Sequence, residues 1–319
     1  MSQIMVSIIC NTYNHERYIE EALVGFVSQE TTFEYEILIH DDASTDRTAD
    51  IIRGYEKKYP HLIKPIYQSE NQFSKKVRIT ADIQYPRARG KYIAFCEGDD
   101  YWTDKSKLQR QYDLLEKNSE INICAHAAYT EIDGEIDNKL FPRKKDGVFT
   151  VESVIINDGD FVATASLMVR KNVLENVYKF FRVSSGDYAV QIMGAVDQGM
   201  IYIGRPMSVY RFQTPGSWSA RTINNQTVKV NHYKKMIQFL VEVEKKLPVK
   251  YSTVIEFQKN AYMFELAKTE RDCVKLKEAK KELCLQKNWK LYGYYIPRSR
   301  LRKFIKFHLP IKYWSRGRS

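Results

Sequence analysis

Two pairs of adjacent aspartates are the residues in this sequence whose type and spacing best suit chemistry. Asp41 and Asp42 follow one strand-like run, Asp99 and Asp100 follow another, and Glu97 lies just before the second pair. In open parallel sheets, ligands bind outside the carboxyl ends of the strands, so both pairs are expected at one edge. Clustered carboxylates raise one another's pKa unless a cation compensates, and oxygen ligands favour Mg²⁺ or Mn²⁺ together with substrate phosphates. The pattern predicts a Mn²⁺ or Mg²⁺ site beside a phosphate-bearing ligand.

Both pairs also have a purely structural explanation. Two aspartates after a strand often form a turn or a helix N-cap, and this alternative stays open for Asp41 and Asp42. It explains Asp99 and Asp100 less well, because Gly98 lets the backbone turn sharply and places two carboxylates side by side. Convergence of both pairs on one edge favours the functional interpretation.

Several enzyme classes lack their sequence signals here. The chain has no GxxxxGKS/T loop, no GxGxxG after its first strand-like run and no GxSxG elbow. Its six histidines show no HExxH spacing, and its five cysteines form no CxxC pair. These absences exclude a P-loop NTPase and count against a dinucleotide oxidoreductase. They also indicate that the cysteines are core residues of a reducing compartment.

Short strand-like runs alternate with amphipathic helices over the first 100 residues. The apolar patterns predict strands at 5–10, 34–40, 62–68 and 91–97, and helices at 16–28, 45–59 and 78–89. This order predicts an α/β fold with a mainly parallel sheet that is flanked by helices.

The pattern is looser beyond residue 100. It predicts helices at 104–118 and 187–198, strands at 121–130, 166–170 and 200–204, and a loop or hairpin at 131–147. From about 223 to 288 the chain reads as helical, with a break at Pro248. A change in charge and periodicity predicts a boundary near 220, between a domain of residues 1–220 and a helical extension of residues 221–319.

Three segments resemble the family 2 glycosyltransferases. They are VSIICNTYNHERYIEEALVGFVSQ, YEILIHDDASTDRTADII and ARGKYIAFCEGDDYWTDKSKLQRQ. The likeness covers residues 4–130 closely and 160–220 more loosely. It implies the GT-A (Rossmann-like) fold, with a nucleotide-sugar half at 1–130, an acceptor half at 131–220 and a C-terminal helical extension.

The resemblance implies roles for the residues that follow the first two strands. Asn11 and Tyr13 are expected to contact the base or ribose of the donor, Tyr13 by stacking. Asp42 is expected to hydrogen-bond the uracil edge of a uridine nucleotide, with Asp41 beside it on the same loop.

The resemblance also assigns the second acidic pair. Asp99 is expected nearer the ribose or sugar and close to the metal, and Asp100 is expected on the metal that bridges the diphosphate. Glu97 stands where the family often has Asp.

The catalytic base implied by the family is an acid that opens a helix in the second half. The matching residue is Asp187, although Gly186 replaces the usual Glu, and a simple helix N-cap is the alternative. Downstream, SVYRFQTPGSWSAR resembles a loop that covers the donor. Arg211 is expected to pair with the diphosphate and Trp218 to pack on a sugar face, while core packing or a loop anchor is an alternative for Trp218.

Together these roles imply an inverting, single-displacement glycosyltransferase. It would move one sugar from a nucleotide diphosphate sugar, UDP-sugar favoured, to a hydroxyl of a glycan or a lipid-linked saccharide. The resemblance is to bacterial-type enzymes of surface polysaccharide synthesis.

Charge is distributed unevenly along the chain. Residues 1–220 hold 26 Lys and Arg against 31 Asp and Glu, whereas residues 221–319 hold 24 Lys and Arg against eight Asp and Glu.

Residues 288–319 contain eight aromatic residues and no acid. A basic amphipathic helix with aromatic residues is typical of binding to an anionic membrane. With neither a signal peptide nor a membrane span expected, the sequence predicts a cytoplasmic protein held peripherally on the inner face of the cell membrane. A disordered tail and a helix docked on the catalytic domain are the alternatives.

Three rival functions are less well supported. A nucleotidyltransferase would need a Gly- and Lys-rich phosphate loop, which CNTYNHERY does not offer. A nucleic-acid-binding protein is disfavoured by the acidic first part and the lack of a recognised motif, so no nucleic-acid partner is expected. A processive synthase would bring transmembrane helices and a QxxRW segment.

Overall fold

The computed structural model describes residues 3–143, 145–181 and 186–285. The chain forms two compact units. The first contains 1–151, 159–182 and 186–221, and the second contains 152–158 together with the chain from 222 onward.

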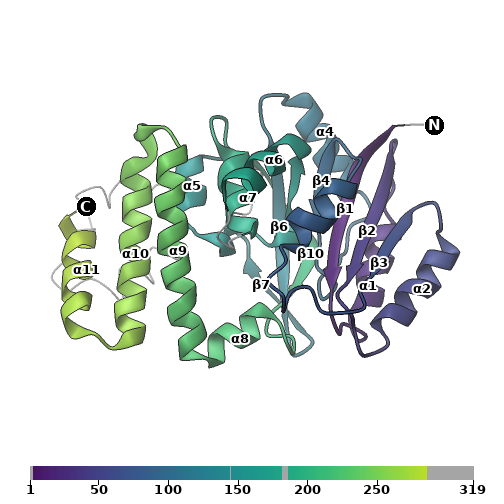
Figure 1. Cartoon of the computed structure of the whole chain (residues 1–319). Helices are drawn as coiled ribbons and strands as arrows, with labels where there is room; N and C mark the ends of the chain where they lie inside the picture. The colour runs from purple at the N-terminus through teal and green to yellow at the C-terminus, as the bar shows by residue number, and fades with distance from the viewer. Residues whose placement is uncertain (1–2, 144, 182–185, 286–319) are drawn as a thin grey trace. The chain divides into compact units, whose positions relative to one another are not determined.

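A ten-stranded sheet organises the first unit, and its first part is parallel (Figure 1). Four neighbouring strands all run in one direction, in the order β3 (Ile63–Tyr67), β2 (Glu34–Asp41), β1 (Ile4–Thr12) and β4 (Tyr92–Phe95). Five consecutive residues of β1 are buried, as expected for a strand covered on both faces. The predicted α/β architecture is confirmed.

The second part of the sheet is mixed. Two long strands continue the direction of the first four, as expected for a mainly parallel sheet, and short antiparallel strands lie among them. After β4 come β9 (Met168–Arg170), β6 (Ile123–Ile132), β10 (Met200–Arg211) and β5 (Tyr101–Trp102). Because β9 lies antiparallel between β4 and β6, the uniform direction of the first four strands ends there. β7 (Glu135–Leu140) forms a hairpin with β6, one of the two alternatives predicted at 131–147, and β8 (Gly147–Phe149) pairs with β10.

Helices flank this sheet (Figure 1). They are α1 (Ile19–Val27), α2 (Thr48–Lys58), α4 (Lys107–Lys117), α6 (Lys171–Phe180) and α7 (Gly186–Ala195). The helix predicted at 78–89 is instead a π-helical turn at Ile79–Gln84 followed by the short α3 (Tyr85–Arg87). Apolar residues of α1 and of the central strands form the core, where Phe26 of α1 packs edge-on against Trp102.

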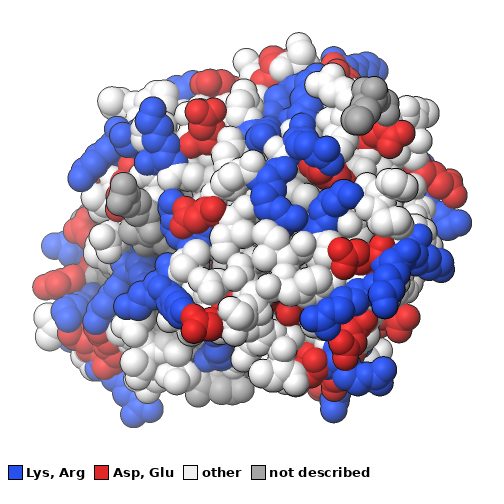
Figure 2. Space-filling model, turned by 45° about the vertical axis from the view of Figure 1, so that its right-hand side comes forward, with Lys and Arg blue, Asp and Glu red and all other residues white. Residues whose placement is uncertain are grey.

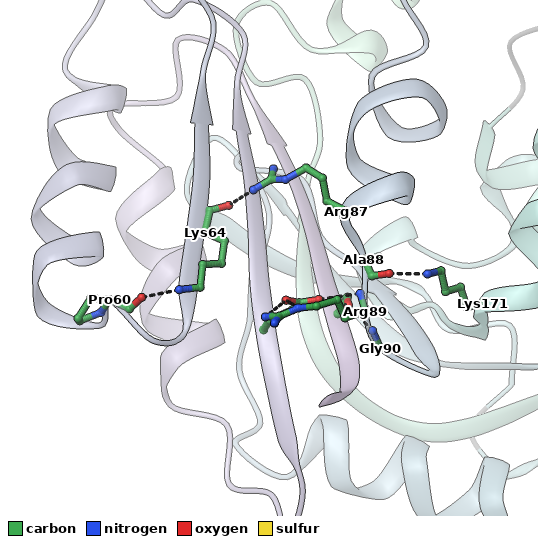
Figure 3. A network of polar contacts seen from close by, with 9 residues as sticks. Pro60, Lys64, Arg87, Ala88, Arg89, Gly90 and Lys171 are labelled. Atoms are coloured by element: carbon green, nitrogen blue, oxygen red, sulfur yellow. Dashed lines mark hydrogen bonds and ion pairs between the residues drawn. The ribbon is translucent and has the colours of Figure 1, made fainter. Parts of the chain in front are cut away.

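A polar network fixes the segment that enters β4 (Figure 3). Arg87 donates to the carbonyl oxygen of Lys64 at 2.7 Å, and Arg89 pairs with the buried Glu36 at 2.6 Å. The main-chain nitrogen of Gly90 donates to Ser7 at 2.9 Å. This network holds the amino end of β4 against β1 and β2, so it sets where the carboxyl end of β4 emerges.

The second unit is helical. Within it, α9 (Gln226–Lys246) packs beside α10 (Ser252–Glu270), and α10 beside α11 (Cys273–Leu285). Pro248 interrupts the helices as predicted, and a second break follows α10, where Arg271 adopts a left-handed conformation with φ 59°. Among the described helices, none is both long enough and apolar enough to cross a membrane. The expected membrane-binding segment, 288–319, lies outside the described residues.

Two further helices are α5 (Val151–Ile156) and α8 (Trp218–Asn224).

Acidic and basic side chains are interspersed over the face shown in Figure 2, with a group of Lys and Arg in its upper part.

Candidate active site

The two acidic loops meet beside the end of β1. The backbone nitrogen of Asp42 donates to the carbonyl oxygen of Thr12 at 2.9 Å, and that of Gly98 donates to the carbonyl oxygen of Asn11 at 2.9 Å. The carboxyl ends of β1, β2 and β4 therefore bring both aspartate pairs to one edge of the sheet. This is the edge of a parallel sheet at which ligands bind.

Gly98 permits a very close approach of the second acidic loop to β1. A Cβ atom at this position would lie 2.7 Å from the hydroxyl oxygen of Thr12 and 3.0 Å from Nδ1 of His15. Any larger residue would therefore push the loop, and Asp99 and Asp100 with it, away from the strand end.

Asp99 and Asp100 are both held by the end of β10 and the segment after it. Oδ1 of Asp100, which is 3% exposed, accepts a hydrogen bond from the backbone nitrogen of Arg211 at 2.8 Å. Oδ2 of Asp99 accepts one from the hydroxyl of Thr214 at 3.0 Å. A segment about 110 residues later in the chain thus sets the orientation of the acidic pair.

Negative charge accumulates at this edge. Burial raises the pKa of Glu97 to about 8, and the nearby charge of Asp99 adds to the rise. Burial, followed by the charge of Asp99, also raises the pKa of Asp100 well above its usual range. Carboxylates that repel one another in this way fit a divalent cation.

The protein itself would supply few ligands to such a cation. Among the described residues, no group of three or more His, Cys, Asp or Glu side chains is arranged to hold a metal ion. An Mg²⁺ or Mn²⁺ site completed by phosphate oxygens and water is consistent with one or two carboxylates from Asp99 and Asp100.

The guanidinium of Arg211 is already occupied. It forms ion pairs with Glu21 at 2.7 Å and with Glu131 at 3.2 Å, and Nη1 donates to the carbonyl oxygen of Asp99 at 3.0 Å. The structure therefore places Arg211 within the protein's own charge network, whereas the sequence led us to expect a partner of the diphosphate.

Asp42 is also engaged within the protein. Its two carboxylate oxygens accept hydrogen bonds from the backbone nitrogens of Gln72 and Phe73 at 2.7 and 3.0 Å. Asp41, 2% exposed, accepts from the hydroxyl and backbone nitrogen of Ser44. Asp42 thus holds the loop after β3, and its expected contact with uracil would have to use remaining acceptor capacity of the carboxylate.

The two aromatic side chains expected at the donor site are partly exposed. Tyr13 is 43% exposed and Trp218, the first residue of α8, is 46% exposed. Both exposures suit the stacking roles expected of them. The side chain of Asn11 donates to Thr80 at 3.0 Å and also lies against the carboxyl group of Glu97.

Asp187 lies in the first turn of α7 and is half-buried. Its carboxylate accepts hydrogen bonds from the hydroxyl of Thr164 at 3.1 Å and from the backbone nitrogen of Tyr188 at 2.8 Å. Burial and then the charge of Asp160 raise its pKa to about 6. Asp187 also contributes to the raised pKa of Glu97, so it faces the acidic loop electrostatically.

Some residues of the site were not identified from the sequence. Thr214 bonds to Asp99, and Glu21 and Glu131 hold Arg211. His15 lies against Gly98. Only Thr214 carried a signal, because it falls inside the TPGS segment after β10.

A family model and sequence relatives show which family the chain belongs to. The family model described as Glycosyl transferase family 2 matches residues 7–178, more than half of the chain. The chain belongs to glycosyl transferase family 2.

An uncharacterized protein of Mycobacterium tuberculosis is 34% identical to this glycosyltransferase over 67% of the chain and 60% of the relative. The minor teichoic acid biosynthesis protein GgaA of Bacillus subtilis is 29% identical over 48% of the chain and 34% of the relative. The glycosyltransferase thus matches only part of the length of these relatives.

Solved structures show the same fold. TarS of Staphylococcus aureus in complex with UDP-GlcNAc has a TM-score of 0.61 at 15% identity, covering 91% of each chain. The mannosyltransferase PcManGT from Pyrobaculum calidifontis, in complex with GDP-Man and Mn²⁺, has a TM-score of 0.57 at 16% identity, covering 92% of this chain and 82% of that one. These likenesses establish the GT-A fold of the glycosyltransferase.

Proposed function

We propose that this glycosyltransferase transfers one sugar, with inversion, from a nucleotide diphosphate sugar to a hydroxyl group of a glycan or lipid-linked saccharide. The observation that carries the proposal is the convergence of both aspartate pairs at the carboxyl edge of the sheet, with Asp187 close enough to influence the charge of Glu97. An acidic pair suits a cation and a diphosphate, and a third acid suits a base.

The donor end of the site rests on residues from three strand ends. Tyr13 stacks on the base, Asn11 and Asp41 lie beside the nucleoside, and Asp42 contacts a uracil edge. A uridine nucleotide is favoured by the resemblance, and UDP-GlcNAc and GDP-Man are bound by the structural neighbours TarS and PcManGT, respectively. Asp99 and Asp100 would hold Mn²⁺ or Mg²⁺, which when bound neutralises charge on the leaving diphosphate.

In the reaction, Asp187 accepts the proton of the acceptor hydroxyl. The hydroxyl oxygen forms a bond to the anomeric carbon as the bond from that carbon to the diphosphate breaks, and the nucleoside diphosphate leaves with the electron pair. A positioned base of this kind contributes about 10²–10⁴-fold to the rate. With a pKa of about 6, Asp187 is mostly ionised at neutral pH and ready to act.

The proposed acceptor is a saccharide of surface polysaccharide synthesis. Support comes from GgaA, whose name places it in teichoic acid biosynthesis. A lipid-linked saccharide would also suit a peripheral, cytoplasmic enzyme whose basic segment 288–319 binds an anionic membrane. Among the alternatives, a nucleotidyltransferase lacks a phosphate loop, and the family assignment leaves no support for a protein without transferase activity.

The test is nucleotide release from a panel of UDP-, GDP- and dTDP-sugars with Mn²⁺, Mg²⁺ or EDTA. We expect metal-dependent release with one donor, lost in Asp100→Ala and kept in Asp50→Ala, whose side chain is 70% exposed on α2. Failure of every nucleotide sugar to bind or react under all metal conditions would overturn the proposal.

A further inference from the structure

Arg211 is enclosed by groups from four parts of the first unit. Its side chain is 5% exposed and pairs with Glu21 of α1 and Glu131 of β6. The rings of Tyr18 and Tyr101 lie 5.0 and 4.4 Å from the guanidinium carbon. Tyr101 in turn donates its hydroxyl to Glu131 at 3.2 Å. These contacts fix both the position and the plane of the guanidinium.

Two further hydrogen bonds of Arg211 reach the acidic loop. Nη1 donates to the carbonyl oxygen of Asp99 at 3.0 Å, and the backbone nitrogen donates to Oδ1 of Asp100 at 2.8 Å. One residue therefore holds both the carbonyl of the peptide that joins the two aspartates and the side chain of Asp100. Thr214, three residues later, holds the side chain of Asp99.

We propose that Arg211 is a positioning residue that orients the Asp99–Asp100 peptide for the cation and the diphosphate, and that it does not bind the diphosphate itself. The proposal rests on the function proposed above. It deepens that function by assigning the orientation of the acidic pair to a residue of β10 and to its partner on α1.

Charge balance supports this role. One guanidinium faces two carboxylates, Glu21 and Glu131, so its positive charge is already matched within the protein. A diphosphate that took Arg211 as a ligand would have to displace them and leave partly buried carboxylates unpaired, which is costly. A planar guanidinium with several donors is also the group best suited to holding a carbonyl oxygen and two carboxylates at once.

The test measures Mn²⁺ binding to the full chain by electron paramagnetic resonance and UDP binding by calorimetry, with Mn²⁺ or with EDTA. We expect Arg211→Met to weaken Mn²⁺ binding and the Mn²⁺-dependent part of UDP binding by about 10–100-fold. UDP affinity in EDTA should change less than about threefold, because the base contacts assigned to Tyr13 and Asp42 come from residues that Arg211 does not hold. Arg211→Lys should weaken Mn²⁺ binding as much as Arg211→Met, since a single ammonium group cannot replace the several donors of a planar guanidinium.

Glu21→Ala separates orientation from direct binding. Glu21 is half-exposed on α1, so the variant should fold, and its neighbour Glu20→Ala is the matched control. If Arg211 is a positioning residue, Glu21→Ala weakens Mn²⁺ binding by about 3–10-fold, whereas Glu20→Ala has no effect. If Arg211 binds the diphosphate, Glu21→Ala frees it and strengthens UDP binding, which overturns the proposal.

The outcomes separate this inference from the proposed function. Wild-type protein that binds Mn²⁺ without transferring any sugar contradicts the function alone. Transfer by wild type, together with wild-type Mn²⁺ affinity in Arg211→Met and Glu21→Ala, contradicts only the positioning role. If Arg211→Met does not fold, the test uses the other two variants. Mn²⁺ binding should then weaken by about 10–100-fold in Arg211→Lys and by about 3–10-fold in Glu21→Ala. Wild-type protein that binds no Mn²⁺ contradicts the positioning role as stated.

Discussion

Asp187 changes from its protonated to its ionised form near pH 6. Burial and Asp160 raise its pKa to about 6, while Thr164 and Tyr188 donate hydrogen bonds to its carboxylate. Because a base must be ionised, we expect kcat/KM to fall about tenfold per pH unit below about pH 6 and to level off above it. Asp187→Asn should lower kcat by about 10²–10⁴-fold. A pH profile of sugar transfer, with both proteins, measures this.

Stability provides the control for Asp187→Asn. The folded-state pKa is raised from 3.8 to about 6, so the stability that the protonated side chain contributes is present at low pH and is lost as the pH rises through about 6. The variant should therefore gain up to about 3 kcal/mol over wild type at pH 8, and almost nothing at pH 4. A variant that melts below wild type at pH 8 would point to a structural role for this carboxylate.

Individual residues of the site were predictable where their chemistry is local. Asp99 and Asp100 stand at a strand end, where residue type and spacing single them out as candidates, whereas Asp187 was proposed only from the family resemblance. The partners of Arg211 are different, since Glu21 lies 190 residues away in the chain and Glu131 lies 80 away. Contacts at such separations depend on strand order, which a single sequence does not encode in any short pattern.

At the scale of elements, the turn between β4 and β5 depends on one glycine. Gly98→Ala would bring a Cβ atom within 2.7 Å of Thr12, so the acidic loop must shift. We expect at least a tenfold loss of kcat/KM with a small change in melting temperature, because a displacement of about 1 Å can cost about 10²-fold. Gly54→Ala, a helical position with nothing within 4 Å, is the control and should keep full activity and gain about 0.5–1 kcal/mol. Equal activity of the two variants would contradict the close-approach argument.

The helix α4 carries a lysine in the core. Lys107 is fully buried, donates to Gln111 at 2.8 Å and lies 3.9 Å from the ring centroid of Trp102. Burial lowers its pKa to about 7, so the protonated form is less favourable in the folded state than in the unfolded chain. The stability of wild type relative to Lys107→Met should therefore rise by about 1–3 kcal/mol between pH 7 and pH 9. Urea unfolding of both proteins at the two pH values measures the difference, and a constant difference would contradict the lowered pKa.

The elements themselves were largely predictable up to β4. Period-two and helical patterns located β1, β2, α1 and α2 to within a few residues. The π-helical turn before β4 was missed because its apolar spacing resembles that of an ordinary helix. The antiparallel β9 was placed correctly as a strand, but its direction and its neighbours depend on a connection that has no local signal.

At the scale of the whole chain, positive charge is concentrated after residue 220. Residues 221–319 carry 24 Lys and Arg against eight Asp and Glu. We expect the full chain to float with liposomes that contain anionic lipid, and to be released as salt rises from about 0.1 to 1 M, because the Debye length falls from about 10 to 3 Å. Removal of 288–319 should abolish flotation without changing nucleotide binding. Flotation of the shortened chain equal to that of the full chain would rule out this segment as the membrane contact.

The ion pairs of Arg211 have a consequence for recombination between relatives. They join β10 to α1, so a crossover anywhere between β6 and β10 would separate Arg211 from Glu21 and Glu131. A chimaera that inherits the arginine from one parent but lacks an acidic partner from the other leaves a buried charge unpaired, at about 3–5 kcal/mol. The two halves expected from the resemblance, residues 1–130 and 131–220, are therefore joined by the Arg211–Glu21 ion pair and would not be independent modules. Functional chimaeras should arise only between parents that carry the same set of charges on both sides of the crossover.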